Sequence, residues 1–232
     1  MLRLIAPLLL VLAFGYLAQR FALWRSAKML DEQSAALIDP DLRPALQALA
    51  RAQGITTIRL YLLANDTVNG LAAADGRIFL TRGFYQKFRT GRVSADEIAS
   101  VVAHELGHVA LGHSRRRMIA FTGQNALRFA LAAVLSRLIP FAGPWIAGMV
   151  TAAMMAGLSR HDEFQADEYA AALLAKAGIG TAPQKTLLVK LQALTGFAQP
   201  GATDWLASHP ATPDRIHAIE ALERRWGLVS QV

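Results

Sequence analysis

Two histidines four residues apart, with a glutamate directly after the first, restrict the fold of this 232-residue chain more than any other feature. On a helix, His104 and His108 lie on one face, about 40° apart around the axis and one turn apart in height. Two imidazoles at this spacing can reach one metal ion. Glu105 lies beside them, where it can contact a water molecule on that ion without being a ligand. The fold must therefore bring further ligands to this face.

The flanking residues indicate that the pattern does lie on a helix. Ser94 is followed three residues later by Glu97, which is the spacing of a capping box. The helix is expected to run from Ser94 to about His113, with apolar residues along one face for the core. This context favours a hydrolytic zinc site, in which Glu105 takes a proton from the attacking water, over two unrelated histidines beside a carboxylate.

A catalytic zinc needs a third protein ligand and an open position for water. His113 does not fit, because on a continuous helix it would lie about 140° around the axis from His108. Glu163 and Asp167 are four residues apart and share a helical face, so one carboxylate can bind the metal while the other orients a histidine ligand. An ordinary solvated acidic face is the alternative, and His161 is a second candidate for the third ligand.

The remaining pattern predicts one α+β domain, mostly helical with a small antiparallel β-sheet. An Asp-Gly pair at residues 75–76 between two apolar runs is a strong hairpin signal. The expected strands are Thr57–Leu63, Thr67–Ala73 and Arg77–Thr81. The further helices are Ser26–Ala52 in two pieces broken near Asp39-Pro40, one that begins at Ser159 and ends near Gly178, Gln184–Leu194 and Asp214–Trp226, with a loop at Trp205–Pro213.

An uncharged apolar run from Leu4 to Ala18 opens the chain. It is short for a bilayer span, which needs about 20 apolar residues, but further apolar residues beyond Arg20 extend it. A signal peptide would begin in the same way; because no small-x-small cleavage site follows, a retained anchor is favoured. We expect residues 1–25 to be a membrane anchor or signal segment and residues 26–232 to be the folded domain, at a bacterial-type inner membrane, with the side of the membrane left open.

A second apolar stretch, residues 138–158, has no formal charge and is long enough for a span. A single crossing would place His108 and Glu163 on opposite sides of the membrane, where they could not share an ion. A double crossing of residues 118–158 would place Arg128 near the middle of the bilayer, which is costly. We therefore expect a non-spanning element that packs on the domain or dips into lipid.

The net charge of +7 is compatible with an anionic membrane surface, acidic substrates or nucleic acid. No RNA- or DNA-binding signature is present, and a solvated helix end explains the tightest basic cluster, Arg115 to Arg117. No nucleic-acid partner is therefore expected. The absence of cysteine excludes disulfides, thiolate catalysis and cysteine metal sites.

These motifs resemble those of the M48 family of zinc metallopeptidases, which includes HtpX-like, Ste24-like and Oma1-like proteins. In that family H-E-x-x-H supplies two ligands and E-x-x-x-D supplies the third. The resemblance implies a zincin-like fold and one zinc ion per chain. It implies that His104, His108 and Glu163 hold this ion, that Glu105 is the base and that Asp167 orients a ligand.

Two further stretches resemble the family, and the resemblance covers roughly residues 40–222. Residues 68–83 look like its N-A-F-A and G-x-I-x-x-x-x-G region, an edge strand beside the zinc to which an extended substrate can add. Asn69, Gly70 and Leu71 are thus implied to bind substrate, although Gly70 and Leu71 replace the usual alanine and aromatic residue. Ser208-His209-Pro210 with Arg215 is similar to the late S-H-P…R-I signature, which implies that His209 stabilises the oxyanion and that Arg215 braces the site.

We therefore expect a zinc-dependent metalloendopeptidase that hydrolyses peptide bonds in unfolded or membrane-associated proteins through a Glu-activated, zinc-bound water. A non-catalytic membrane adaptor or holdase on the same scaffold is the alternative. The intact Glu105 argues against this alternative, because a catalytically inactive protein does not need a base. An aminopeptidase is a third hypothesis, but the sequence offers no clear acidic anchor for the substrate amine. Other divalent metals would bind the same ligands.

Overall fold

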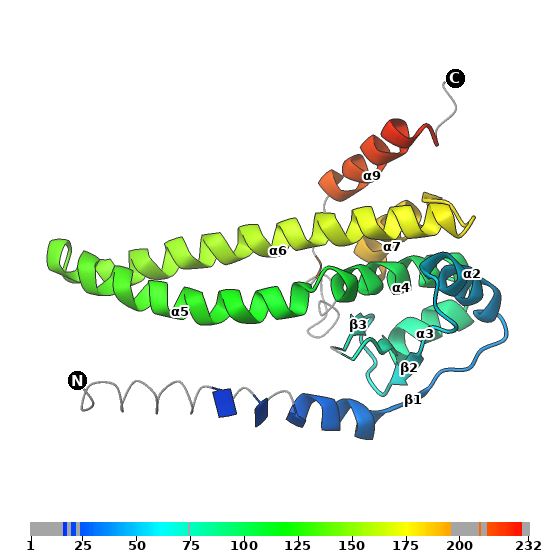
Figure 1. The fold of residues 1–232 in the computed structure, drawn as a ribbon, viewed down its shortest axis with the longest axis horizontal. Coiled ribbons are helices and arrows are strands. Elements are labelled where there is room, and N and C mark those ends of the chain that lie inside the picture. Colours follow the sequence, from blue (N-terminus) through cyan, green and yellow to red (C-terminus); the bar gives the residue numbers. More distant parts are fainter. Residues whose placement is uncertain are drawn as a thin grey trace.

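The computed structural model describes residues 16–17, 20–21, 24–73, 75–195, 209 and 213–228. Most of this part of the chain is helical, including residues 24–33, and a small four-stranded sheet packs against the helices (Figure 1). The fold is therefore α+β, as predicted. The helices are α2 (Arg43–Gln53), α3 (Arg82–Arg89), α4 (Ala95–Ala110), α5 (His113–Leu138), α6 (Gly143–Lys176), α7 (Ala182–Thr195) and α9 (Pro213–Trp226), and the strands are β1 (Ser34–Ala36), β2 (Leu60–Leu63), β3 (Gly70–Ala72) and β4 (Ile78–Thr81).

The sheet is mixed, with the strand order β1-β2-β4-β3. The predicted hairpin is confirmed: β3 and β4 are antiparallel, and Gly76 in the turn between them has a φ of +81°, which favours glycine. The expectation of an antiparallel sheet is wrong for β2 and β4, which are parallel, with Leu60 opposite Ile78. The connection after β2 first carries the chain to the outer edge, where β3 lies, and β4 then returns beside β2 in the same direction.

Two elements of this region were not predicted. Residues 34–36 were expected to be helical, and their sequence Ser-Ala-Ala has no β-branched or aromatic residue. They form β1 because they pair with β2, Ser34 lying opposite Leu63. The short helix α3 follows β4 directly, and Thr81 caps it by accepting a hydrogen bond of 3.4 Å from the Phe84 backbone N–H. Pairing with a distant segment thus overrode local propensity in β1.

α4 is the central helix of the domain and packs against α2, α6, α7 and β3. Its capping box is confirmed: Ser94 Oγ accepts from the Glu97 backbone N–H at 3.1 Å, and Glu97 Oε2 accepts from the Ser94 N–H at 2.8 Å. Every residue from Glu97 to His108 is buried. The helix ends at Ala110 rather than near residue 113, because Gly112 adopts a left-handed conformation with a φ of +66° and α5 begins directly after it.

α5 and α6 form a long antiparallel hairpin that projects from the rest of the domain (Figure 1). α6 runs through 34 residues without interruption. The expectation that a helix begins at Ser159 is therefore wrong, because Ser159 lies inside α6 and Gly157 before it is accommodated in the helix. The two helices approach closely near the tip, where a Cβ on Gly143 would lie 2.5 Å from the backbone nitrogen of Ser136.

The apolar residues 138–158, which were expected not to span a membrane, form the tip of this hairpin and the first half of α6. Within the part of the chain that the structure describes, no helix combines the length and the apolar character needed to cross a bilayer. The predicted anchor at residues 1–25 lies mostly outside the described residues.

The C-terminal helices pack beside α4 and α6. α7 and α9 confirm the helices predicted at Gln184–Leu194 and Asp214–Trp226 to within two residues at each end. α9 contacts α6 and α7, and α7 also contacts α4. His209 lies in the segment before α9, while most of the loop expected at residues 205–213 lies outside the described residues. This arrangement brings α4, α6 and the segment before α9 to one buried site.

Candidate metal centre

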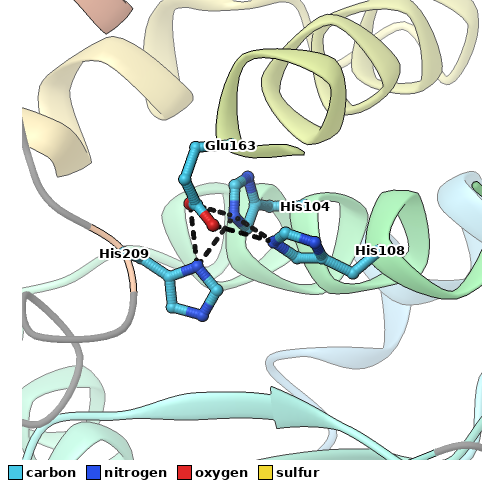
Figure 2. Close-up of side chains that lie close together, drawn as sticks. All are labelled: His104, His108, Glu163 and His209. Carbon is cyan, nitrogen blue, oxygen red and sulfur yellow. Dashed lines mark hydrogen bonds and ion pairs between the residues drawn. The ribbon is translucent and has the colours of Figure 1, made fainter. Parts of the chain in front are cut away.

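Four buried side chains from three elements meet at one point (Figure 2). His104 and His108 come from α4, Glu163 from α6, and His209 from the segment before α9. One donor atom of each lies within 4.8 Å of the others. His161, the second candidate for the third ligand, is exposed on α6 and does not join them. These four residues are the candidate metal site.

The separations of the donor atoms fit a tetrahedral metal ion. His104 Nε2 lies 3.2 Å from His108 Nε2 and 3.3 Å from Glu163 Oε2, and His108 Nε2 lies 3.4 Å from Glu163 Oε1. In a tetrahedral zinc site with bonds of about 2.0–2.1 Å, neighbouring donor atoms are about 3.3 Å apart. Imidazole nitrogens and carboxylate oxygens are also ligand types that zinc prefers, so the residues present fit this ion.

A buried ion pair holds the ring of His104 in place. His104 Nδ1 donates to Asp167 Oδ1 at 3.0 Å. Arg215 donates to both oxygens of that carboxylate, from Nε at 2.6 Å and from Nη2 at 2.8 Å, and Gln184 Nε2 adds a bond of 3.2 Å. With Nδ1 donating, the lone pair of His104 Nε2 faces the other donor atoms. Asp167 and Arg215 thus lie where the sequence analysis expects them.

Burial and charge shift the pKa values within the site. Burial alone would lower the pKa of His104, but its bonds to Asp167 and Glu163 outweigh burial and raise this pKa to about 9. Burial dominates for His108 and lowers its pKa to about 4. Burial would raise the pKa of Glu163, but the surrounding imidazoles bring it well below its ordinary value. Glu163 is therefore ionised, and an ion that binds His104 must displace a proton.

Glu105 lies next to the donor atoms but is not one of them. Its side chain is buried, and burial raises the pKa of this carboxyl group above its ordinary value. Within the described residues Glu105 Oε1 has no hydrogen-bond partner, and His209 Nε2 lies 3.6 Å from it. A buried polar atom of this kind is a position at which water would bind. The position suits the base that the sequence analysis predicts.

His209 lies as close to the donor atoms as they lie to one another. Its Nδ1 is 2.8 Å from Glu163 Oε2 and 3.4 Å from His104 Nε2. In this orientation the ring could complete a tetrahedral set, whereas a ring turned away from Glu163 would leave a position open for water. The oxyanion role expected for His209 requires the second orientation and stays a prediction.

Comparison with known families decides the class of this protein. The model of peptidase family M48 matches residues 36–223. This chain belongs to peptidase family M48. Its M48 relatives include the metalloproteases LoiP and YcaL of Escherichia coli strain K12, 31% and 30% identical over 68% and 71% of this chain. A protease HtpX homologue of Acaryochloris marina is 26% identical over 84% of this chain and 78% of its own length. The matches cover 59% of LoiP and 61% of YcaL, so the chain spans about three-fifths of those proteins.

In this M48 protein the edge strand β3 lies directly against α4. A Cβ on Gly70 would lie 2.7 Å from a valine methyl of α4 and 4.0 Å from Glu105 Cγ, so glycine permits the close approach of the strand to α4, beside Glu105. Leu71 packs against a separate apolar cluster with Leu30 and Phe79. The Asn69 backbone N–H donates to a threonine hydroxyl of β4 at 2.9 Å. Gly70 thus lies against the helix that carries the site.

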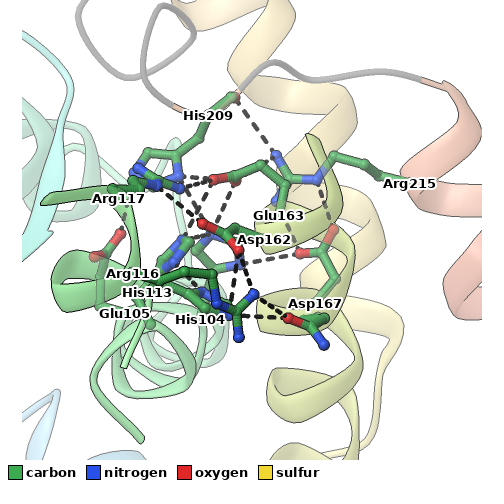
Figure 3. Close-up of polar contacts among 12 residues, drawn as sticks. His104, Glu105, His113, Arg116, Arg117, Asp162, Glu163, Asp167, His209 and Arg215 are labelled. Carbon is green, nitrogen blue, oxygen red and sulfur yellow. Dashed lines mark hydrogen bonds and ion pairs between the residues drawn. The ribbon is translucent and has the colours of Figure 1, made fainter. Parts of the chain in front are cut away.

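A second polar cluster of the M48 domain was not predicted; it includes His113, Arg116, Arg117 and Asp162 (Figure 3). A helix that continued from Ser94 through residue 113, as predicted, would point His113 away from His108. His113 is not one of the four converging residues, but it does not point away from His108: Gly112 turns the chain, and His113 Nδ1 lies 2.7 Å from His108 Nδ1. The same glycine was the sequence signal that could have indicated this turn.

The basic residues after this turn belong to the same cluster. Arg116 and Arg117 donate to the buried carboxylate of Asp162 at 2.8 and 3.2 Å, and Arg117 also donates to Glu163 at 3.1 Å. Their interpretation as part of a solvated helix end is therefore wrong, since their side chains are 39% and 34% exposed and paired. The acidic partner of Arg116 lies 46 residues along the chain, which explains why local sequence gave no indication of the pair.

Proposed function

We propose that this M48 protein is a zinc-dependent metalloendopeptidase of zincin-like fold. His104, His108 and Glu163 are the proposed ligands of one zinc ion, and Glu105 is the proposed base. The observation that carries the proposal is the convergence of two imidazole nitrogens and the two oxygens of one carboxylate at separations of 3.2 to 3.4 Å, which suit a tetrahedral ion. The relatives are named metalloproteases and proteases, which supports protein substrates.

The surroundings of Glu105 suit the transfer of a proton during hydrolysis. When bound, zinc would supply a Lewis acid that polarises the scissile carbonyl and makes water more acidic. Glu105 takes up the proton of the attacking water at Oε1 and later delivers it to the leaving amine. Burial raises the pKa of this carboxyl group, which makes it a stronger base toward the attacking water. We propose that His209, once turned away from Glu163, donates to the developing oxyanion.

The position of β3 supports an endopeptidase rather than an aminopeptidase. An extended peptide added to the outer edge of this strand would pass Glu105 with chain on both sides of the scissile bond. Pairing of this kind uses backbone hydrogen bonds, which any unfolded chain can supply. We therefore include unfolded or membrane-associated proteins as the substrate class.

Casein cleavage and zinc content of the purified full chain test the proposal. Glu105→Gln keeps the shape of the side chain but removes its basicity. We expect it to hold as much zinc as the wild type and to cleave at least about 100-fold more slowly. Glu168→Gln is the matched control, because it makes the same change at an exposed position of α6 and should leave both quantities unchanged.

Each outcome separates the hypotheses. A wild-type protein that binds no zinc overturns the metal site. Zinc binding without cleavage favours a non-catalytic adaptor or holdase. Cleavage by Glu105→Gln at the wild-type rate refutes its role as the base while leaving the metal site intact.

The location of the protein is the second part of the proposal. We infer that residues 1–25 anchor the chain in a membrane, that residues 26–232 form the peptidase domain, and that the tip of the α5–α6 hairpin dips into the lipid interface. At this tip Phe141 is fully exposed and Trp145 is 67% exposed. Aromatic rings and arginines such as Arg137 are typical of membrane interfaces. Further exposed apolar side chains follow along the hairpin: Leu138, Ile139, Met149, Val150 and Met154.

Fluorescence can test the contact of the tip with lipid. The chain has no cysteine, so Phe141→Cys gives a single site for an environment-sensitive fluorophore. Vesicles of phosphatidylcholine and phosphatidylglycerol should shift the emission of this label to shorter wavelength. Ile38→Cys, in the connection between β1 and α2, is a control, because Ile38 is an equally apolar and 80% exposed residue outside the hairpin. Equal behaviour of the two labels would overturn the tip contact without affecting the zinc proposal.

A further inference from the structure

The rings of His108 and His113 share one proton. Their Nδ1 atoms lie 2.7 Å apart, and at this distance one nitrogen donates and the other accepts. The opposite nitrogen of His108, Nε2, faces the candidate metal site and lies 3.4 Å from Glu163 Oε1. His113 is 1% exposed, so bulk water does not compete for the shared proton. Which ring donates decides whether His108 Nε2 has a lone pair for a metal.

Arg116 determines the direction of this bond. A guanidinium can only donate, and Arg116 Nη1 lies 3.0 Å from Gln165 Oε1, which therefore accepts. The same oxygen lies 3.3 Å from His113 Nε2, so this nitrogen carries a proton and donates. A neutral imidazole with its proton on Nε2 has its lone pair on Nδ1. His113 is consequently the acceptor, and His108 the donor.

The far end of this chain of bonds is firmly held. Asp162 has a fully buried side chain and accepts from Arg116 at 2.8 Å and from Arg117 at 3.2 Å. Gln165 lies one helical turn further along α6, so the same helix holds the guanidinium on both sides. The bond directions are therefore fixed from the cation of Arg116, through Gln165 Oε1 as the acceptor that Arg116 and His113 share, to the ligand His108. Figure 3 shows the side chains of Arg116, Asp162 and His113.

We propose that His113 is a positioning residue that sets the tautomer and the ring orientation of His108. With its proton on Nδ1, His108 presents the lone pair of Nε2 to the metal. The Nδ1–H of His104 is held in the same way by the carboxylate of Asp167. The Nδ1–H of His108 is held instead by the neutral ring of His113, the first residue of α5. The base of the hairpin thus completes the metal site. The inference rests on the proposed zinc site.

A pair of substitutions distinguishes this role from simple packing. In asparagine the amide oxygen is bonded to Cγ, as Nδ1 is in histidine, so His113→Asn keeps an acceptor for His108. His113→Leu has nearly the same shape as asparagine and no acceptor. Zinc and cobalt(II) affinities of the full chain, measured by competition with a chelator, should fall about 10- to 100-fold in His113→Leu and less than about fivefold in His113→Asn.

The outcomes of this experiment are separable from those of the zinc proposal. Equal losses of affinity in both variants would show that His113 only fills space and would overturn the inference, as would wild-type affinity in His113→Leu. A wild-type chain that binds neither metal would remove the zinc proposal and this inference together. Nitrogen-15 NMR of the zinc-bound protein gives an independent readout. It should show His113 as the Nε2–H tautomer, and the Nδ1–H tautomer would contradict the direction of donation.

Discussion

Replacement of Asp167 by asparagine should weaken both the fold and the metal site. The carboxylate is buried and accepts from Arg215 Nε at 2.6 Å through one oxygen, and from Arg215 Nη2 at 2.8 Å and His104 Nδ1 at 3.0 Å through the other. Asparagine has one oxygen and one NH₂ group of nearly the same shape. Whichever way the amide lies, its NH₂ faces a donor, and Arg215 loses the charge that balances it.

The expected loss follows from the burial of this pair. Removing one partner of a buried ion pair costs about 3–5 kcal/mol, and Arg215 Nη1 keeps Glu163 at 3.6 Å as a weaker counter-charge. We therefore expect the lower value, a loss of about 3 kcal/mol in the free energy of unfolding. With a urea slope of about 2 kcal/mol per M, the midpoint should fall by about 1.5 M. The affinity for zinc should fall about 10- to 100-fold, because His104 loses its orienting acceptor.

Urea unfolding of the metal-free protein, followed by circular dichroism, measures the first quantity, and chelator competition measures the second. Asp41→Asn is the matched control, since Asp41 is 69% exposed and pairs with Arg89 at the surface. It should change the free energy of unfolding by less than about 1 kcal/mol. A midpoint for Asp167→Asn within about 0.3 M of the wild type, on the same urea slope, would refute the reasoning from the buried pair.

Two further predictions concern helix contact and pH. In Gly107→Ala a Cβ would lie 3.1 Å from the backbone of Ala166, which forces α4 and α6 apart. Zinc affinity should therefore fall, while the gain in helix propensity of about 1 kcal/mol limits the loss of stability. The control variant Gly157→Ala has no atom within 4 Å of its Cβ, so it should raise the melting temperature and leave zinc affinity unchanged. Burial would raise the pKa of Glu97, but hydrogen bonds from Lys190, the Ser94 N–H and the Thr186 hydroxyl lower this pKa below 4.5. The ionised carboxylate therefore stabilises the fold above pH 4.5. This stabilisation is lost as the pH falls through the lowered pKa. Glu97→Gln should thus reduce the free energy of unfolding by roughly 1 kcal/mol at pH 7 and by less at about pH 3, and an equal reduction at both pH values, measured by urea unfolding of metal-free protein, would contradict this assignment.

Sequence alone was most informative where a structure depends on neighbouring residues. The capping box of α4 needs residues three positions apart, and the β3–β4 hairpin needs a local Asp-Gly turn; the structure confirms both. His209 and Arg215 were located only through the family resemblance, because a loop histidine beside proline carries no chemical signal of its own. The structure nevertheless brings both to the site.

The main errors in the predicted helix boundaries occur at glycines, because a single glycine in the sequence does not show whether a helix continues through it. At Gly112 the backbone is left-handed and α4 ends, whereas Gly157 lies inside the uninterrupted α6. A helical glycine costs only about 1 kcal/mol relative to alanine, so packing against other segments decides between these outcomes. The predicted helices had the opposite arrangement: one continued through Gly112 and the other began only after Gly157. These predictions therefore missed the turn that brings His113 to His108, and with it the pairs of Arg116 and Arg117 with Asp162.

The uninterrupted α6 has a consequence for which bonds the proposed peptidase can cut. Trp145 at the tip and Glu163 at the site lie on this one continuous helix, about 27 Å apart along the axis at 1.5 Å per residue. In the proposed arrangement, with the tip in the lipid interface and the hairpin perpendicular to the membrane, α6 sets the distance between the membrane surface and the scissile bond. An extended substrate rises about 3.3 Å per residue, so the first bond within reach lies about eight residues from the membrane surface. Lengthening both helices by two turns would move the cut outward by about three residues.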